Sequence, residues 1–182
     1  MLEGSRLARR TAPLPLGGEG SVRVLAAASR LSVRVRLGAA LPPGLDLGIN
    51  RCAEADGRLT VRLGPDEWLV IGPEADAEAM AAEIAERLAG RPHAVVDVSH
   101  RNVALAVSGP GAAEILNAGC PLDLHPARFP AGTGTRTILG KAEIVLLRQG
   151  EAEAGEAAYR VECWRSFAPY VHGFLREASL NL

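Results

Sequence analysis

Alternation of apolar and polar residues constrains this chain more than any other feature of its sequence. Between residues 31 and 37, leucine and valine occupy every second position and alternate with serine and arginine, which is the period of a half-buried β-strand. Residues 59–63 show the same alternation. After a Gly-Pro-Asp turn at 64–66, residues 67–71 are predicted to return as the second strand of a hairpin, with Trp68 on its apolar face.

A helix is predicted after this hairpin. Apolar residues between Ala77 and Leu88 recur at spacings of three and four, glutamate and arginine occupy the other face, and Gly90 with Pro92 ends the pattern. The first half of the chain is therefore predicted to consist of strands followed by one helix.

The second half repeats this order of elements. Residues 94–98 and 103–107 are predicted strands, and alanine between the larger residues of the second one indicates burial on both faces. A helix is predicted to follow at once, with Ser108 or Gly109 as its cap, Pro110 in its first turn and an end at Gly119.

Three more elements complete the second half. Residues 135–139 and 142–147 are predicted to form a hairpin, because Gly140-Lys141 is a glycine-first pair suited to a type II′ turn. Residues 159–163 are a predicted strand, and Ser166 is the predicted cap of a last amphipathic helix.

These elements predict an α+β fold of two ferredoxin-like, pseudo-duplicated halves that share one sheet. We expect a single domain over residues 25–182, with its halves at about 25–91 and 92–182. Residues 1–24 combine arginine, proline and a glycine-rich tract, and are predicted to be an arm that is flexible or ordered only by a partner.

Charge and composition argue against nucleic-acid and membrane partners. The chain has 20 basic and 21 acidic residues and a net charge of -1, whereas anionic partners favour a basic protein. No uncharged run approaches the ~20 residues of a membrane-spanning helix. The three cysteines, Cys52, Cys120 and Cys163, lack the spacing of a zinc knuckle or disulfide framework, so we expect a cytoplasmic protein.

The run DVSHR at 97–101 contains the residue types of a nucleophilic triad. Ser99 and His100 are adjacent, however, so on an extended chain they point to opposite faces, and no G-x-S-x-G elbow exposes the serine. We therefore interpret this run as a turn between two buried strands. No catalytic residue is predicted.

Two other motifs also lack a complete site. Cys120, Asp123 and His125 could ligate a metal, but no second pair of ligands matches them, so a polar loop after a helix is predicted and no metal. The sequence Gly-Pro-Gly at 109–111 lacks the G-x-G-x-x-G spacing of a dinucleotide site, and we interpret it as the tight start of a packed helix.

Aromatic residues are scarce at 4% of the chain, and large aromatic side chains lie either in cores or in contact hot spots. The default expectation for Trp68, Trp164, Phe167 and Tyr170 is therefore a position in the core. Trp164 and Arg165, at the end of a predicted strand, are the pair most readily placed at a surface, and they are the candidate subunit-interface residues.

Four stretches in this order resemble the gamma subunit of heterotetrameric sarcosine oxidases: LGPDEWLV at 63–70, DVSHR at 97–101, VSGPGA at 107–112 and YRVECWRSF at 159–167. The likeness covers roughly residues 25–180. The last three also look like parts of the folate-binding fold of glycine-cleavage aminomethyltransferases, to which the gamma subunit is distantly similar.

The resemblance implies a complex of alpha, beta, gamma and delta chains that oxidatively demethylates sarcosine to glycine, with hydrogen peroxide and 5,10-methylenetetrahydrofolate as products. It implies that FAD, FMN, NAD, tetrahydrofolate and zinc are bound by the other subunits and that this chain binds none. It also implies that this chain belongs to an oxidoreductase complex without supplying catalytic residues.

Two other functions stay open at this point. A free-standing, folate-dependent protein of the aminomethyltransferase type would need a carboxylate near the bound pterin, and Asp97 is the candidate folate-binding residue. An RNA-associated module would need unpaired arginines, but the arginines alternate along strands as solvated faces and are balanced by acids.

Overall fold

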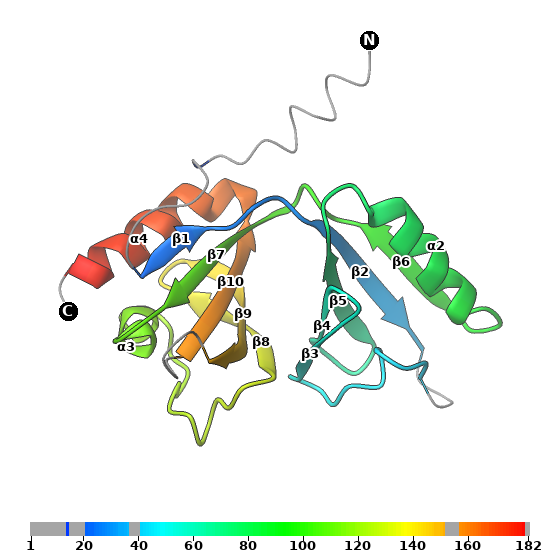
Figure 1. Ribbon diagram of the computed structural model, residues 1–182, viewed down its shortest axis with the longest axis horizontal. Helices are drawn as coiled ribbons and strands as arrows, with labels where there is room; N and C mark the ends of the chain where they lie inside the picture. The colour runs from blue at the N-terminus through cyan, green and yellow to red at the C-terminus, as the bar shows by residue number, and fades with distance from the viewer. Residues whose placement is uncertain (1–13, 15–20, 37–40, 152–156, 181–182) are drawn as a thin grey trace, which may run out of the picture. The chain divides into compact units, whose positions relative to one another are not determined.

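The computed structural model describes residue 14 and residues 21–36, 41–151 and 157–180. Its residues divide into two compact units (Figure 1). Ala28–Ser99 form one, which we call the inserted unit, and Met1–Ala27 with His100–Leu182 form the other, which we call the terminal unit. All strand pairs are antiparallel, so the fold is of the predicted α+β class.

The inserted unit contains a five-stranded sheet in the order β3-β4-β5-β2-β6. Its strands are β2 (Ser29–Val35), β3 (Cys52–Ala55), β4 (Arg58–Arg62), β5 (Glu67–Gly72) and β6 (His93–Asp97). The predicted hairpin is confirmed, because Val61 pairs with Leu69 and Leu59 with Ile71.

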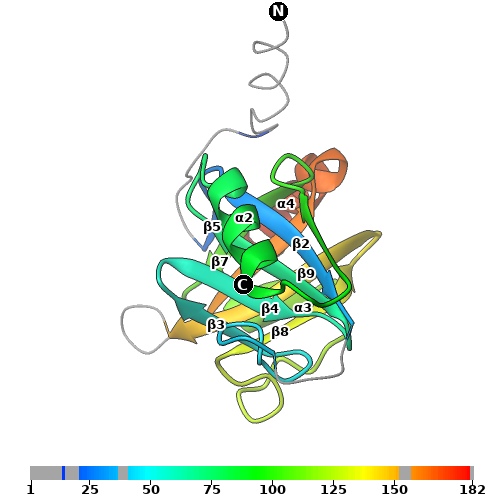
Figure 2. The ribbon, with the colours of Figure 1, turned by 90° about the vertical axis from the view of Figure 1, so that its right-hand side faces the viewer.

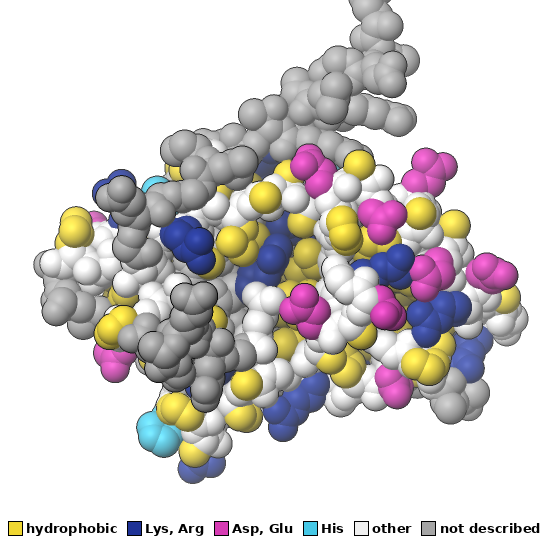
Figure 3. Space-filling model, viewed as in Figure 1, with side chains coloured by type: hydrophobic (Ala, Val, Ile, Leu, Met, Phe, Trp, Pro, Cys, Tyr) yellow, Lys and Arg dark blue, Asp and Glu magenta, His cyan; other side chains and the backbone are white. Residues whose placement is uncertain are grey.

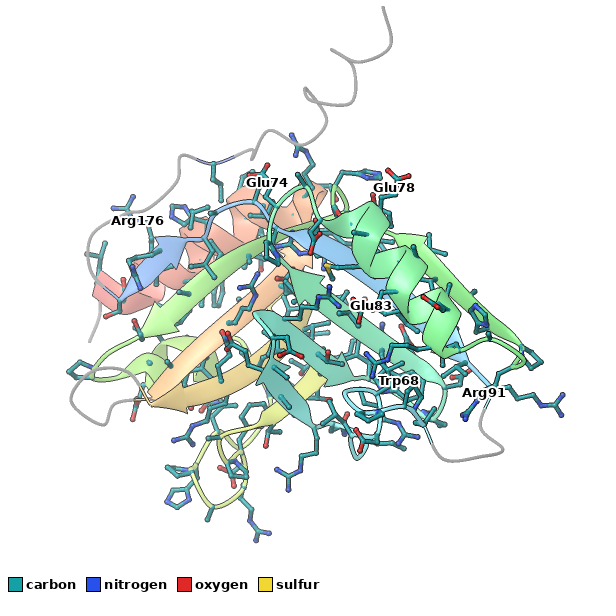
Figure 4. All side chains as sticks on the ribbon, turned by 45° about the vertical axis from the view of Figure 1, so that its right-hand side comes forward. Trp68, Glu74, Glu78, Glu83, Arg91 and Arg176 are labelled. Carbon is teal, nitrogen blue, oxygen red and sulfur yellow. The ribbon has the colours of Figure 1, made fainter. Side chains whose placement is uncertain are left out.

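Helix α2 (Ala77–Arg87) packs its apolar side on this sheet (Figure 2). Met80 and Ile84 are buried in one cluster with Trp68 of β5, and the predicted spacing of apolar residues is thereby confirmed. Figure 4 labels Trp68 on β5 and Glu83 on α2. Glu83 accepts a hydrogen bond of 2.7 Å from Arg58 of β4, which lowers the pKa of this carboxyl group.

Arg62 holds the turn of the β4–β5 hairpin. Its guanidinium lies over the Trp68 ring, 4.9 Å from the centroid. It also donates hydrogen bonds to three carbonyl oxygens, those of Leu47 (2.8 Å), Gly64 (3.2 Å) and Pro65 (2.8 Å). A single side chain thus fixes the turn and a neighbouring loop against the aromatic ring.

The terminal unit has its own five-stranded sheet, in the order β1-β7-β10-β9-β8. Its strands are β1 (Val22–Val24), β7 (Asn102–Ser108), β8 (Thr133–Leu139), β9 (Ala142–Glu151) and β10 (Ala157–Trp164). Helices α3 (Ala112–Asn117) and α4 (Ala168–Leu180) pack on it, and a 3-10 helix, η1 (Arg165–Phe167), leads from β10 into α4.

The β8–β9 turn is the predicted one. Leu139 pairs with Ala142 across the turn. Gly140 has a positive φ of 56°, whereas Lys141 does not have a positive φ. A positive φ at the first central residue alone is the pattern of a type II′ turn.

The predicted boundary between halves differs from the observed one. β6 pairs with β2, so residues 93–97 belong with the first part of the chain, and the boundary along the chain falls between Ser99 and His100. β1 pairs with β7 and so lies in the terminal unit, although Val22–Val24 were predicted to be part of the arm. The prediction of one shared sheet is wrong, since each unit has its own. The rest of the arm, except residue 14 and Ser21, lies outside the described residues, as does Leu37.

Both predicted caps in the terminal unit are also wrong. Gly111, with φ of 78°, is the N-cap of α3, and Ser166 lies within η1 and caps nothing. β6 is exposed along most of its length rather than buried, because it is an edge strand that pairs only with β2 among the described strands. β3 was not predicted.

The three cysteines are all buried, and none of them forms a disulfide in the described part of the chain. Burial raises the pKa of the Cys52 thiol to about 11, against the smaller opposing effect of the Arg51 charge. Roughly one Cys52 in a thousand is then a thiolate at pH 8, and the thiolate is the reactive form.

We therefore expect no thiol of the native chain to react with a disulfide reagent at pH 8 within minutes, and all three to react after unfolding in guanidinium. Thiol titration by absorbance checks this. Rapid reaction of even one native thiol would contradict the burial seen here.

Candidate interaction surface

Three aromatic side chains near the end of the chain are exposed at a regular spacing. Trp164 ends β10, Phe167 ends η1 and Tyr170 lies in the first turn of α4. These residues are 47%, 39% and 38% exposed, respectively. We call Trp164, Phe167 and Tyr170 the aromatic strip. Large exposed aromatic residues are enriched in protein interfaces.

Packing on the other side of α4 holds Tyr170, the member of the aromatic strip that lies in this helix, at the surface. Ala168, Val171 and Leu175 are fully buried against the sheet, so the helix cannot turn Tyr170 inward. The Tyr170 hydroxyl oxygen accepts a hydrogen bond of 3.1 Å from the backbone N–H of Lys141 in the β8–β9 turn. Tyr170 is therefore fixed both by its helix and by the β8–β9 turn.

An open pocket of about 530 Å³ adjoins the strip. Its lining residues, which we call the basic pocket, are His100, Arg101, Trp164, Arg165 and Ser166. The backbone N–H of Arg165 donates to the carbonyl oxygen of Arg101 at 2.8 Å, which ties together the two segments that form the pocket. Trp164 and Arg165, the predicted interface candidates, thus lie together at one exposed site.

The DVSHR run forms a turn, as predicted. The backbone N–H of Ser99 donates to Asp97 Oδ1 at 2.9 Å, and the Ser99 hydroxyl donates to the same oxygen. Ser99 Oγ also accepts a hydrogen bond of 2.9 Å from the backbone N–H of Arg30 in β2. These bonds give Asp97 and Ser99 a structural role, and folate binding by Asp97 stays a prediction.

The loop after α3 is held by hydrogen bonds and by burial. Cys120 is buried in the core of the terminal unit, Asp123 Oδ1 accepts from the backbone N–H of His125 at 3.0 Å, and His125 Nδ1 accepts from Ala127 N–H at 3.3 Å. In residues 14, 21–36, 41–151 and 157–180, no three His, Cys, Asp or Glu side chains are grouped as metal ligands. In the same part of the chain, no helix is long and apolar enough to cross a bilayer.

Several surface residues were missed by the sequence analysis. His100 and Arg101 were considered only as parts of a turn, and Phe167 and Tyr170 were expected in the core. Their spacing gave no reliable signal, because Trp164, Phe167 and Tyr170 lie in three different elements.

The fold matches that of a solved aminomethyltransferase. The crystal structure of glycine cleavage system aminomethyltransferase T from Bartonella henselae aligns with a TM-score of 0.62 at 18% identity, over 85% of this chain and 44% of that one. The class is therefore the aminomethyltransferase-like α+β fold.

Sequence relatives identify the family within this class. The model of the sarcosine oxidase gamma subunit family matches residues 23–181. Sarcosine oxidase subunit gamma from an Arthrobacter species is 35% identical over 154 residues, which are 80% of this chain and 75% of that protein. A chain of the heterotetrameric sarcosine oxidase from Corynebacterium sp. U-96, solved with pyrrole 2-carboxylate, aligns with a TM-score of 0.75 at 26% identity, over 99% of this chain and 92% of that one. This chain belongs to the sarcosine oxidase gamma subunit family.

Proposed function

We propose that this chain is the gamma subunit of a heterotetrameric sarcosine oxidase and that it acts by binding the alpha, beta and delta subunits. The match over 99% of this chain to a chain of such a heterotetramer carries the proposal. The free-standing one-carbon protein has weaker support, because the family match covers residues 23–181 and belongs to the gamma subunits.

The proposed complex demethylates sarcosine oxidatively to glycine and yields hydrogen peroxide and 5,10-methylenetetrahydrofolate. We assign FAD, FMN, NAD, tetrahydrofolate and zinc to the other subunits and no cofactor to this chain. The exposed aromatic strip supports a binding role, because leaving three large aromatic residues in water is unfavourable unless a partner covers them.

Coexpression with the three other subunits tests this function. The tagged chain is expected to copurify with them in equal amounts, and alone it is expected to self-associate. The double variant Trp164→Ser with Phe167→Ser is expected to retain roughly tenfold less partner, because aromatic anchors dominate interface energies.

Ile49→Ser is the matched control, since Ile49 is an equally exposed apolar residue of the inserted unit. It is expected to copurify like the wild type. A wild-type chain that stays monomeric and never retains the other subunits would contradict the proposed function.

A further inference from the structure

The basic pocket is built on two paired strand ends. Trp164 pairs with Asn102 at the start of β7, and the bond between Arg165 N–H and the Arg101 carbonyl continues this ladder by one residue. Asn102 is itself buried and accepts a hydrogen bond of 3.3 Å from Arg101 Nε through its side-chain oxygen. The pocket thus has a fixed backbone and an exposed indole at its edge.

The charge of this pocket is one-sided. Arg101 and Arg165 line it together with His100, and none of the described residues that line it carries a carboxylate. Among the described residues no acidic side chain forms an ion pair with either arginine. The pocket therefore holds positive charge that the described part of the chain does not neutralise.

Several arginines elsewhere in the chain lie against acidic side chains. Arg58 pairs with Glu83 at 2.7 Å, Arg160 with Glu162 at 2.8 Å, and Arg34 with two acids. Figure 3 shows basic and acidic side chains next to each other over the part of the surface formed by the inserted unit. Arg101 and Arg165 have no such acidic partner among the described residues, and they line one pocket together with a tryptophan that is exposed.

We propose that the basic pocket receives an acidic segment of a partner subunit, with carboxylates on Arg101 and Arg165 and an adjacent apolar side chain on the Trp164 indole. This rests on the proposed function, which supplies the partner. The planar guanidinium group binds carboxylates through two parallel hydrogen bonds, and the indole offers apolar area beside it. The pocket is open rather than enclosed, which suits a protein segment better than a small molecule that must be largely buried.

Charge reversal in the coexpressed complex is the first test. Arg101→Glu and Arg165→Glu are each expected to lower the amount of retained partner roughly tenfold, because a like charge then faces the acidic segment. Arg128→Glu makes the same charge change at an exposed site of the terminal unit outside the pocket, and is expected to behave like the wild type.

Zero-length crosslinking identifies the occupant. Lys141 is the only lysine of the chain, so Arg165→Lys introduces one new side-chain amine that a carbodiimide can join to a carboxylate in contact with it. Mass spectrometry of the crosslinked complex is expected to connect position 165 to an Asp- or Glu-containing peptide of a partner subunit. Arg128→Lys is the control and is expected to give no such peptide.

The outcomes separate this inference from the proposed function. Suppose that the wild-type chain copurifies with its partners, that charge reversal leaves the amount of retained partner unchanged and that position 165 gives no crosslink. The proposal of an acidic segment in the pocket is then wrong, and the subunit role stands. If the isolated chain instead binds glutarate with micromolar affinity, and Arg165→Glu abolishes this binding while leaving the complex intact, the pocket is a small-anion site. A wild-type chain that retains no partner overturns both.

Discussion

Replacing Trp68 with alanine is expected to lower the free energy of unfolding by about 3–5 kcal/mol, the usual cost of removing a buried tryptophan. Trp68 is fully buried in the cluster that joins β2, β5 and α2. Its loss leaves a cavity and also removes the ring on which the Arg62 guanidinium lies. Urea unfolding followed by far-UV circular dichroism measures the change.

Two other variants make this expectation specific. Trp68→Phe is expected to cost less than half as much, since it keeps an apolar ring and removes an indole N–H that has no hydrogen-bond partner among the described residues. Trp164→Ala, at a tryptophan that is 47% exposed, is expected to change stability by only about 0.5 kcal/mol. If Trp68→Ala lowered the free energy of unfolding as little as Trp164→Ala, the cluster would not depend on Trp68.

Local patterns were sufficient for the elements whose partners are neighbours in sequence. The β4–β5 hairpin, α2 and the β8–β9 hairpin follow from alternation, from helical spacing and from a glycine-first turn, each within about twenty residues. Nothing outside these segments is needed to specify them.

Pairing between distant strands could not be predicted in this way. β1 pairs with β7, more than 75 residues later, and β6 joins β2 across the whole inserted unit. The sequence of β6 gives no sign of its partner, so the boundary between units was placed before this strand rather than after it. β3 is mostly exposed and has the sequence CAEA, which lacks the alternation that marks a half-buried strand.

The candidate surface was predicted only in part, for a related reason. Trp164 and Arg165 were singled out because they follow a strand, but composition alone cannot distinguish a buried aromatic residue from an exposed one. The exposure of Tyr170 depends on which side of α4 faces the sheet, and Phe167 lies in η1, which was not predicted. The basic pocket requires His100 and Arg101 to meet Arg165, which are more than 60 positions apart.

Gly140→Ala is expected to lower the free energy of unfolding of the terminal unit by about 2–4 kcal/mol. Gly140 has φ of 56°, a backbone conformation that residues other than glycine rarely adopt. A methyl group there would also overlap the Tyr170 hydroxyl oxygen, which holds the turn by accepting from Lys141 N–H. The measurement is again urea unfolding by circular dichroism.

A second substitution separates the clash from the backbone strain. In a Tyr170→Phe background the overlapping oxygen is absent, and the next contacts of the added methyl are at 3.4 Å and 3.7 Å, within ordinary van der Waals range. Gly140→Ala should then cost only about 1 kcal/mol, the part that comes from φ. Gly173→Ala is the matched control, since Gly173 lies inside α4 with nothing within 4 Å of an added methyl, and it is expected to stabilise the chain by about 0.5–1 kcal/mol. The same cost for Gly140→Ala in both backgrounds would show that contact with Tyr170 does not limit this turn.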